Sequence, residues 1–112
     1  MSQSETIKCL LKDAWHVAFT DLPEEYEGTT IVWGTVEIDY TGDYEKGFWC
    51  CTSPVRHIED DMVTTQNSLY QILGALKPIS LPLKCSPILR EGFDPVTCIE
   101  LLSGRMSIQV DW

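Results

Sequence analysis

The sequence is poor in basic residues and in histidine: eight Lys and Arg and two His stand against seventeen Asp and Glu, giving a formal net charge of −9. Affinity for nucleic acid comes mainly from basic side chains that neutralise phosphates, so this balance argues against direct nucleic-acid binding. Anionic lipid headgroups would also repel the chain. No run of about 18 apolar residues occurs, and residues 1–5 lack the basic start of a signal peptide, so we expect a cytoplasmic protein that does not bind membranes.

Patterns that hold metals or phosphates are also missing. Structural zinc sites present paired ligands at close spacing, and the sequence contains no Cys-x-x-Cys pair. Its glycines are isolated and form no phosphate-binding loop. We therefore expect no metal and no cofactor. The one zinc combination considered, without close pairs, is Cys9, His16, Cys85 and Cys98.

The five cysteines are odd in number and include the adjacent pair Cys50 and Cys51, which is typical of reduced thiols rather than of a disulfide framework. A thiolate nucleophile needs a neighbouring base, and His57 or His16 is the candidate. On a regular strand Cys51 and His57 share a face but lie roughly 20 Å apart, at about 3.3 Å per residue. The structural interpretation is preferred, with one thiol in the core and the other facing outward or a second layer. A small cysteine-dependent enzyme stays open as an alternative.

The acidic residues concentrate in one part of the chain. Twelve of the seventeen lie between Asp13 and Asp61, where Lys46 and Arg56 are the only bases, whereas residues 62–90 include three bases and no acid. A field of one sign on a small domain speeds its encounter with an oppositely charged surface. The expected partner is therefore a protein with a basic surface, of the kind that binds nucleic acid.

The apolar pattern predicts a single α+β domain over residues 1–112. A capping box at Ser2-Gln3-Ser4-Glu5 starts a helix over about 7–18, where apolar residues recur every three or four positions. Alternation and β-branched residues predict strands at 29–40, 47–55 and 62–73, the last interrupted by a bulge at Gln66-Asn67-Ser68. Short connections make these strands an antiparallel meander.

The C-terminal third is interrupted by three prolines between residues 78 and 87, which are incompatible with a long helix or a central strand and indicate an extended crossing. Asp94-Pro95 is a strong helix start, so a helix is expected over 95–103. A short strand follows at 106–110. The order α-β-β-β-α-β describes a four-stranded, mainly antiparallel sheet packed by an N-terminal helix and a second, C-terminal helix.

The candidate partner-binding residues are the expected exposed acids and one tryptophan. Trp33 is out of phase with the apolar face of its strand, so it is either buried beneath a helix or exposed among acids as a contact anchor. Neighbouring carboxylates such as Glu37 and Asp39 could also perform acid–base chemistry, although a solvated strand face explains them more simply. The full set is Glu24, Glu25, Glu27, Trp33, Glu37, Asp39, Asp43, Glu45, Glu59, Asp60 and Asp61.

Two segments resemble a pattern in small uncharacterised proteins of bacteria and their phages, in which a W-C-x-S-x-V strand precedes a T-x-N-S-x-Y strand. They run from Gly47 through Trp49-Cys50-Cys51-Thr52-Ser53 to Val55, and from Val63 through Thr65-Gln66-Asn67-Ser68-Leu69-Tyr70 to Ile72. In this chain one extra residue separates Cys50 from Ser53. The resemblance implies a phage, prophage or defence setting, in which small acidic proteins are often inhibitors of the anti-CRISPR kind. It carries no site residue over to this chain.

The sequence thus predicts a non-enzymatic inhibitor whose acids occupy the basic, nucleic-acid-binding surface of a host defence complex. Three alternatives stay open: an immunity protein that neutralises a nuclease toxin, the small cysteine enzyme, and a structural or assembly protein of a phage particle. A binder saturates at a fixed ratio and an enzyme turns over, whereas an assembly protein associates with itself. The sequence leaves the oligomeric state open.

Overall fold

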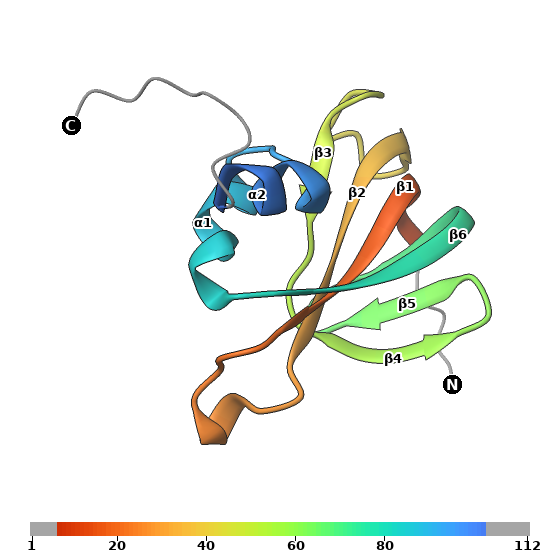
Figure 1. Cartoon of the computed structure of the whole chain (residues 1–112). Helices are drawn as coiled ribbons and strands as arrows, with labels where there is room; N and C mark the ends of the chain where they lie inside the picture. Colours follow the sequence, from red (N-terminus) through yellow and green to blue (C-terminus); the bar gives the residue numbers. More distant parts are fainter. Residues whose placement is uncertain (1–6, 103–112) are drawn as a thin grey trace.

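The computed structural model describes residues 7–102, and these form one six-stranded mixed sheet with two short α-helices on one side (Figure 1). In the sheet the strands lie in the order β3-β2-β1-β6-β5-β4. Two 3-10 turns, η1 (Glu24–Tyr26) and η2 (Leu83–Cys85), precede β2 and the helices α1 (Ser86–Arg90) and α2 (Pro95–Leu102). The strands are β1 (Ile7–Phe19), β2 (Thr30–Asp39), β3 (Trp49–Cys51), β4 (Val55–Glu59), β5 (Met62–Thr65) and β6 (Leu69–Leu81).

The helix expected at the N-terminus is a strand, which overturns the predicted order α-β-β-β-α-β and its four-stranded sheet. β1 lies inside the sheet, antiparallel to β2 and parallel to β6. Asp13 adopts a positive φ of 50° and bulges β1 against β2. Leu11 before the bulge and Ala14 after it are both buried in the same cluster. Two strand segments of different phase therefore imitate the three-and-four spacing of a helix.

The strand expected at 62–73 is two strands joined by a turn, and the bulge predicted at 66–68 is that turn. β5 and β6 pair antiparallel, with Val63 opposite Tyr70. The hydroxyl of Thr65 accepts hydrogen bonds from the backbone nitrogens of Asn67 at 3.4 Å and Ser68 at 3.1 Å. The change of apolar phase at this point is therefore a reversal of the chain.

The segment predicted as an extended crossing is largely the second half of β6. β6 runs beside β1 through Pro78 as far as Leu81. β5 pairs with β6 only up to Gln71, so the second half of β6 has one paired neighbour. A proline lacks the backbone N–H, and an edge without a paired strand is where a sheet tolerates it. The prolines exclude a long helix, as expected, but Pro78 lies within the sheet and Pro87 in the first turn of α1.

Other local predictions are confirmed by β2 and by α2. α2 begins at Pro95, and the Asp94 carboxylate accepts a hydrogen bond of 2.8 Å from the backbone nitrogen of Thr97. The strand expected at 47–55 is cut short after β3, and the strand at 106–110 lies outside the described residues. Neither α-helix in residues 7–102 has the length and apolar character needed to cross a membrane.

Between β3 and β4 the chain passes from one edge of the sheet to the other. The backbone nitrogen of Thr52 donates to the carbonyl of Val32 on β2 at 2.9 Å, and the carbonyl of Pro54 accepts from the backbone nitrogen of Gln66 at 2.9 Å. Three residues are thus enough to connect the β2 side with the turn after β5. The two edge strands, β3 and β4, are consecutive in sequence and are joined by this short link. The sheet must therefore curl to bring its edges near each other, and it encloses an inner surface.

Two apolar clusters fill the two sides of this curled sheet. The helix-side cluster lies between the sheet and the helices, and consists of Val17, Ile31, Trp33, Leu81, Cys85, Leu89 and Cys98. The inner cluster lies on the inside, and consists of Cys9, Leu11, Ala14, Val32, Val36, Cys50, Val63, Tyr70 and Ile72. Both faces of β2 are therefore buried between Ile31 and Val36, because Ile31 and Trp33 face the helices while Val32 and Val36 face inside.

Candidate functional site

Trp33, the aromatic residue in the predicted partner-binding set, belongs to the core. Its side chain is only 6% exposed, and its indole Nε1 donates a 3.0 Å hydrogen bond to the carbonyl oxygen of Leu89 on α1. The ring is therefore unavailable to a partner, and Trp33 is no longer a candidate partner-binding residue. The adjacent thiols follow the structural interpretation, because Cys50 packs in the inner cluster and Cys51 against the helix-side cluster.

Glu37, on β2, is neutralised within the molecule. Lys12 Nζ lies 3.2 Å from Glu37 Oε1, and Lys46 Nζ lies 3.1 Å from Oε2. Hydrogen bonds from Lys46 and Lys12 lower the pKa of this carboxyl. A carboxylate held between two lysines contributes little to the attraction of a distant basic surface.

Asp39 and Asp43 organise the loop after β2. Asp39 accepts hydrogen bonds from the backbone nitrogen and the hydroxyl of Thr41, at 2.9 and 2.6 Å, and from the backbone nitrogen of Tyr44 at 2.6 Å. Burial alone would raise the pKa of Asp39, but these bonds and the charge of Lys8 hold it at about 2. Lys8 also pairs with Asp43 at 3.2 Å. Both acids therefore shape the loop.

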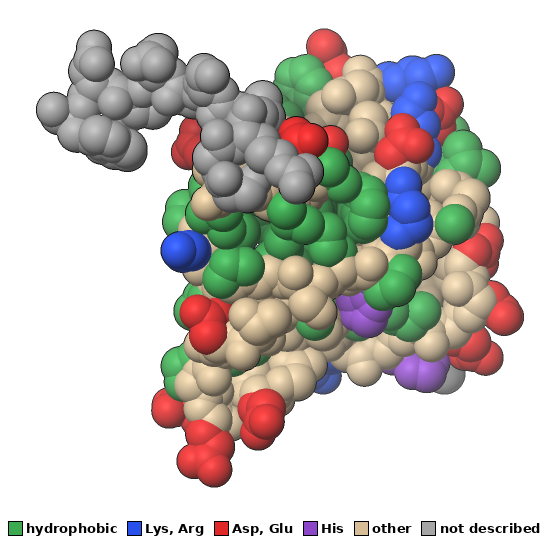
Figure 2. All heavy atoms as spheres, viewed as in Figure 1, with side chains coloured by type: hydrophobic (Ala, Val, Ile, Leu, Met, Phe, Trp, Pro, Cys, Tyr) green, Lys and Arg blue, Asp and Glu red, His purple; other side chains and the backbone are tan. Residues whose placement is uncertain are grey.

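The acids around the turn between β4 and β5 are partly engaged. Glu59 lies 3.4 Å from His57, and the Asp61 carboxylate accepts a 2.9 Å hydrogen bond from the Gln71 amide. Asp60, at the tip, adopts a positive φ of 56°. Figure 2 shows acidic side chains at several separate places on this face of the molecule.

A further acidic group lies at the η1 tip, which we define as Glu24, Glu25, Tyr26 and Glu27. Figure 1 shows η1 at the end of a projecting loop, and Figure 2 shows acidic side chains gathered there, at the lower left. Within residues 7–102, no ion pair or side-chain hydrogen bond engages these three glutamates. All three are exposed, so their charge acts outward. Glu45, in the loop after β2, is also exposed.

An apolar groove of about 320 Å³ adjoins the η1 tip. Its walls are the loop 20–29 and the η2 region, which are fastened together because the Asp21 carboxylate accepts a 2.6 Å hydrogen bond from the backbone nitrogen of Leu83. Tyr26 belongs to both features, since its ring lines the groove and is 57% exposed. Apolar side chains make up most of the lining, namely Phe19, Leu22, Pro23, Tyr26, Ile31, Pro54 and Leu83, and Thr29, Ser86 and Arg90 complete it.

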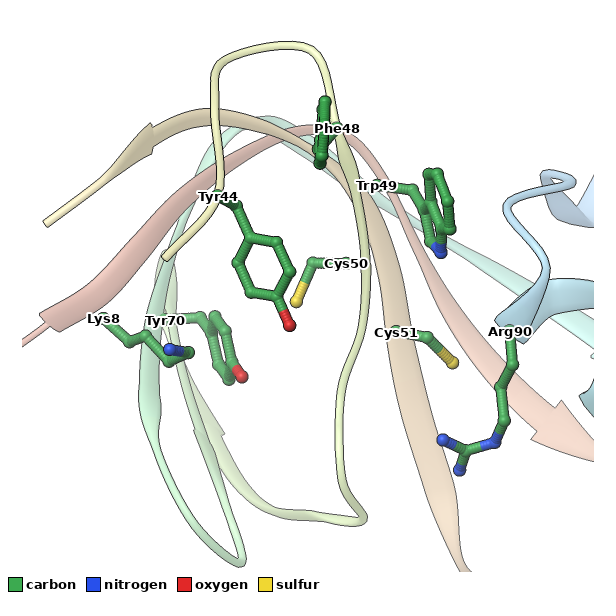
Figure 3. Close-up of a pocket in the computed structure, with 8 residues that line it drawn as sticks. All are labelled: Lys8, Tyr44, Phe48, Trp49, Cys50, Cys51, Tyr70 and Arg90. Atoms are coloured by element: carbon green, nitrogen blue, oxygen red, sulfur yellow. The ribbon is translucent and has the colours of Figure 1, made fainter. Parts of the chain in front are cut away.

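A second concave site, a hollow of about 410 Å³, opens beside β3 (Figure 3). The loop after β2 supplies Tyr44 and Phe48, and the rings of Phe48 and Trp49 stack with centroids 6.3 Å apart at 21°. Strands on both sides complete the wall, and one cation comes from β1 and another from α1. The lining residues are Lys8, Tyr44, Phe48, Trp49, Cys50, Cys51, Tyr70 and Arg90.

The two thiols of the hollow are poor nucleophiles. Burial raises the pKa of Cys50 to about 11, although a hydrogen bond with Tyr70 opposes the rise. Burial also raises the pKa of Cys51, against the opposing charge of Arg90. A thiol with a raised pKa stays protonated near neutral pH, where only the thiolate attacks.

The histidines lie away from these thiols. His16 on β1 has its Nε2 2.8 Å from the hydroxyl of Thr30, and burial lowers its pKa. His57 is exposed on β4 and faces Glu59. Neither histidine lines the hollow. The hollow therefore brings the two thiols together without a histidine in its lining.

The zinc combination is divided between the two clusters. Cys85 and Cys98 are hydrogen-bonded to each other on the helix side, while Cys9 lies in the inner cluster. In the described part of the chain, no group of three or more His, Cys, Asp or Glu is arranged to hold a metal ion. All five cysteines are free thiols.

Both concave sites escaped the sequence analysis because their walls are distant in sequence. The groove joins Tyr26 to Leu83, and the hollow joins Lys8 to Arg90. The available signal was the exposed pair Phe48 and Trp49 directly after a turn, since exposed neighbouring rings are a mark of contact sites. Comparison with protein-family models, with curated proteins and with solved structures finds no match for this chain. The function is therefore argued from the side chains alone.

Proposed function

We propose that the protein is a non-enzymatic binding module that recognises a basic surface on another protein through the η1 tip and the adjoining groove. The proposal depends on one observation: three carboxylates without a partner in residues 7–102 stand beside an apolar groove whose wall contains Tyr26. The matching partner segment carries an apolar side chain flanked by Lys or Arg. The apolar side chain enters the groove and the basic residues face the glutamates.

Charge and apolar contact have different tasks in this proposal. Carboxylates on a chain of net charge −9 steer a basic partner into encounter, and this raises the rate of association. Exposed ion pairs add only about 0–1 kcal/mol each, so they do not supply the affinity. Burial of Tyr26 and Leu83, which are 57% and 37% exposed, supplies it, since buried aromatic anchors dominate binding energy.

The partner that we propose is a nucleic-acid-binding protein of a host defence complex, and an immunity protein would use the same tip against a nuclease toxin. Both partners present basic surfaces for nucleic acid, which the acidic tip would occupy in place of phosphates. Five free thiols support a reducing compartment such as the cytoplasm as the place of this encounter. The raised pKa values of Cys50 and Cys51 support a non-enzymatic role.

The test compares three immobilised baits in capture from the source cell. The first is the unaltered chain, the second carries E24K, E25K and E27K, and the third carries E59K, D60K and D61K. Three reversals of two units each move the net charge of both variants from −9 to −3, so they are matched in charge and differ only in place. We expect the η1-tip variant to lose the partner and the turn variant to retain it. The captured partner is then titrated with the unaltered chain. We expect its nucleic-acid binding to be lost once the two proteins reach a fixed stoichiometric ratio.

Equal loss of capture with both variants would show that net charge alone matters, and would contradict docking at the η1 tip. Capture of a partner that still binds its nucleic acid would contradict the inhibitory role. Circular dichroism of each bait confirms that it is folded. Self-association of the chain without a captured partner would instead favour the assembly-protein alternative.

A further inference from the structure

The hollow beside β3 has a charge opposite to that of the rest of the molecule. Its lining includes the cations Lys8 and Arg90 and no Asp or Glu, in a chain with seventeen acids and eight bases. Its volume of about 410 Å³ lies in the range of small-molecule sites. A small anion that is repelled by the acidic loops would therefore be attracted here.

The two cations are not equivalent. Lys8 Nζ lies 3.2 Å from Asp43 Oδ2 and 5.7 Å from the centre of the Tyr44 ring, so its charge is already paired. Arg90 is exposed at the end of α1, and no ion pair within residues 7–102 engages it. Figure 3 shows its guanidinium extended beside Cys51 at the margin of the hollow. Arg90 is therefore the group available to bind an anion, and its planar fork suits phosphate or carboxylate.

The walls of the hollow are aromatic on two sides. Tyr44, Phe48 and Trp49 are 43%, 47% and 41% exposed. In Figure 3 the hydroxyl groups of Tyr44 and Tyr70 are directed toward the middle of the hollow, and Trp49 stands on the Arg90 side. Flat rings pair favourably with such side chains by offset or edge-to-face stacking. The hollow thus combines an aromatic wall with one unpaired cation.

These walls are held in place within the protein. The backbone nitrogen of Tyr44 donates a 2.6 Å hydrogen bond to Asp39. Trp49 rests against Gly92, where a φ of 105° and the absence of a side chain let the indole approach closely. A ligand would therefore bind without the loss of entropy that ordering these rings would require.

We propose that the hollow binds a small molecule that joins a flat aromatic ring to an anionic group. The ring stacks against Trp49 and Tyr44, and the anionic group binds the guanidinium of Arg90. A nucleoside monophosphate and an aromatic carboxylate share this chemistry. Arg90 also lines the groove beside the η1 tip, so the two concave sites share this residue, but the ligand of the hollow is an anion whereas the partner of the tip is basic.

The experiment is a calorimetric titration of the full chain at low ionic strength with four probes. AMP and indole-3-acetate carry both ring and anion, adenosine carries the ring alone, and inorganic phosphate carries the anion alone. We expect at least one of the first two to bind about tenfold more tightly than adenosine or phosphate, as expected for a charge-assisted hydrogen bond. The ratio between AMP and indole-3-acetate distinguishes a phosphate ligand from a carboxylate ligand.

Four variants locate the binding. Arg90→Ala should remove the tighter binding of AMP relative to adenosine. Arg90→Lys keeps the positive charge and should restore part of this difference in affinity. Trp49→Ala should weaken the binding of every probe that carries a ring. Lys84→Ala removes an exposed cation that lies outside the hollow, and it should leave all affinities unchanged. The E24K/E25K/E27K variant should still bind AMP or indole-3-acetate, and the lost repulsion should only strengthen this binding, which shows that the three glutamates are not part of the site.

Three results would overturn the proposal. The first is that neither AMP nor indole-3-acetate binds with a dissociation constant below about 1 mM, the weak end of the affinity scale. Inorganic phosphate binding as tightly as AMP would show that the ring is not recognised. Equal weakening by Arg90→Ala and Lys84→Ala would show general charge attraction instead of a site. Thermal melts of each variant confirm that it is folded before it is titrated.

Discussion

Val32 and Thr52 are joined by two reciprocal hydrogen bonds. The backbone nitrogen of Val32 donates to the hydroxyl of Thr52, and the backbone nitrogen of Thr52 donates to the carbonyl of Val32, each at 2.9 Å. Thr52 is 1% exposed, so the pair lies out of reach of water. It holds the link between β3 and β4 against β2, which is where the curled sheet nearly closes.

Thr52→Val should therefore destabilise the fold. The change keeps the shape of the side chain but leaves the buried nitrogen of Val32 without its acceptor, which costs about 1–3 kcal/mol. Urea unfolding measures the difference in free energy of unfolding. Thr64→Val is the matched control, because Thr64 is only half-buried and β-branched residues are favoured on strands, so its effect should stay within about 0.5 kcal/mol. Equal effects of the two changes would show that the closing hydrogen bond contributes nothing.

Asp39 should make stability fall in acid. Its pKa is about 2 in the folded protein against 3.8 ordinarily, so the unfolded chain binds the proton first as the pH falls. The stabilisation from Asp39 is therefore complete above about pH 4 and is lost as the pH falls toward 2. Asp39→Asn should remove this part of the pH dependence, measured by thermal melts from pH 2 to 5. Thr41→Val, which deletes one donor, should move the transition to higher pH; an unchanged transition in both variants would contradict the assignment.

Gly92→Ala should shift the indole of Trp49 within the hollow. A Cβ at this position would lie 3.0 Å from Cδ2 of Trp49, which is tighter than nine in ten real Cβ contacts, so the indole would have to move by a few tenths of an ångström. Gly28→Ala is the matched control, because Gly28 also has a positive φ, of 88°, but has nothing within 4 Å. Both changes strain the backbone by roughly 1–3 kcal/mol. Only Gly92→Ala should shift the indole resonance of Trp49 in an NMR spectrum and weaken the binding of ring-bearing probes.

The thiols should react slowly with iodoacetamide near neutral pH. Cys51 is half-buried whereas the other four cysteines are at most 7% exposed, so Cys51 should be alkylated first, as followed by mass spectrometry. Because burial raises its pKa, the rate should climb as the pH rises past 9. Rapid labelling of Cys50 or Cys51 at pH 6 would contradict this expectation and revive the cysteine-enzyme alternative. Urea-unfolded protein, in which all five should react, is the control.

Local signals in the sequence were enough for several elements. The β-branched alternation of 30–39 predicts β2, and Asp94-Pro95 predicts the start of α2, because both depend on side chains that act on their own backbone. Local signals gave the wrong prediction for the N-terminal segment, residues 7–19. Leucine, lysine and alanine favour a helix there, yet β1 gains hydrogen-bonded neighbours on both edges, and one of them is a strand more than fifty residues away.

The candidate sites divide in the same way. The acidic loops could be predicted from the sequence because charge is a property of each residue. Glu24, Glu25 and Glu27 are exposed, as expected. The sequence did not predict that Glu37 is held in ion pairs, because its partners Lys12 and Lys46 come from other parts of the chain. The hydrogen bonds that hold Asp39 were likewise not predicted. Trp33 shows the same limit, since its burial depends on α1, a helix more than fifty residues later.

The sequence by itself determined the charge of this protein, its strand β2, its helix α2 and the exposure of the η1 tip, since these depend on composition and on neighbours along the chain. Only the tertiary structure decided that residues 7–19 are a strand, that the sheet curls, and that Lys8 and Arg90 border one hollow. The physical reason is that hydrogen bonds between strands and the burial of apolar surface join residues far apart in sequence, and local preference cannot predict which pairings win.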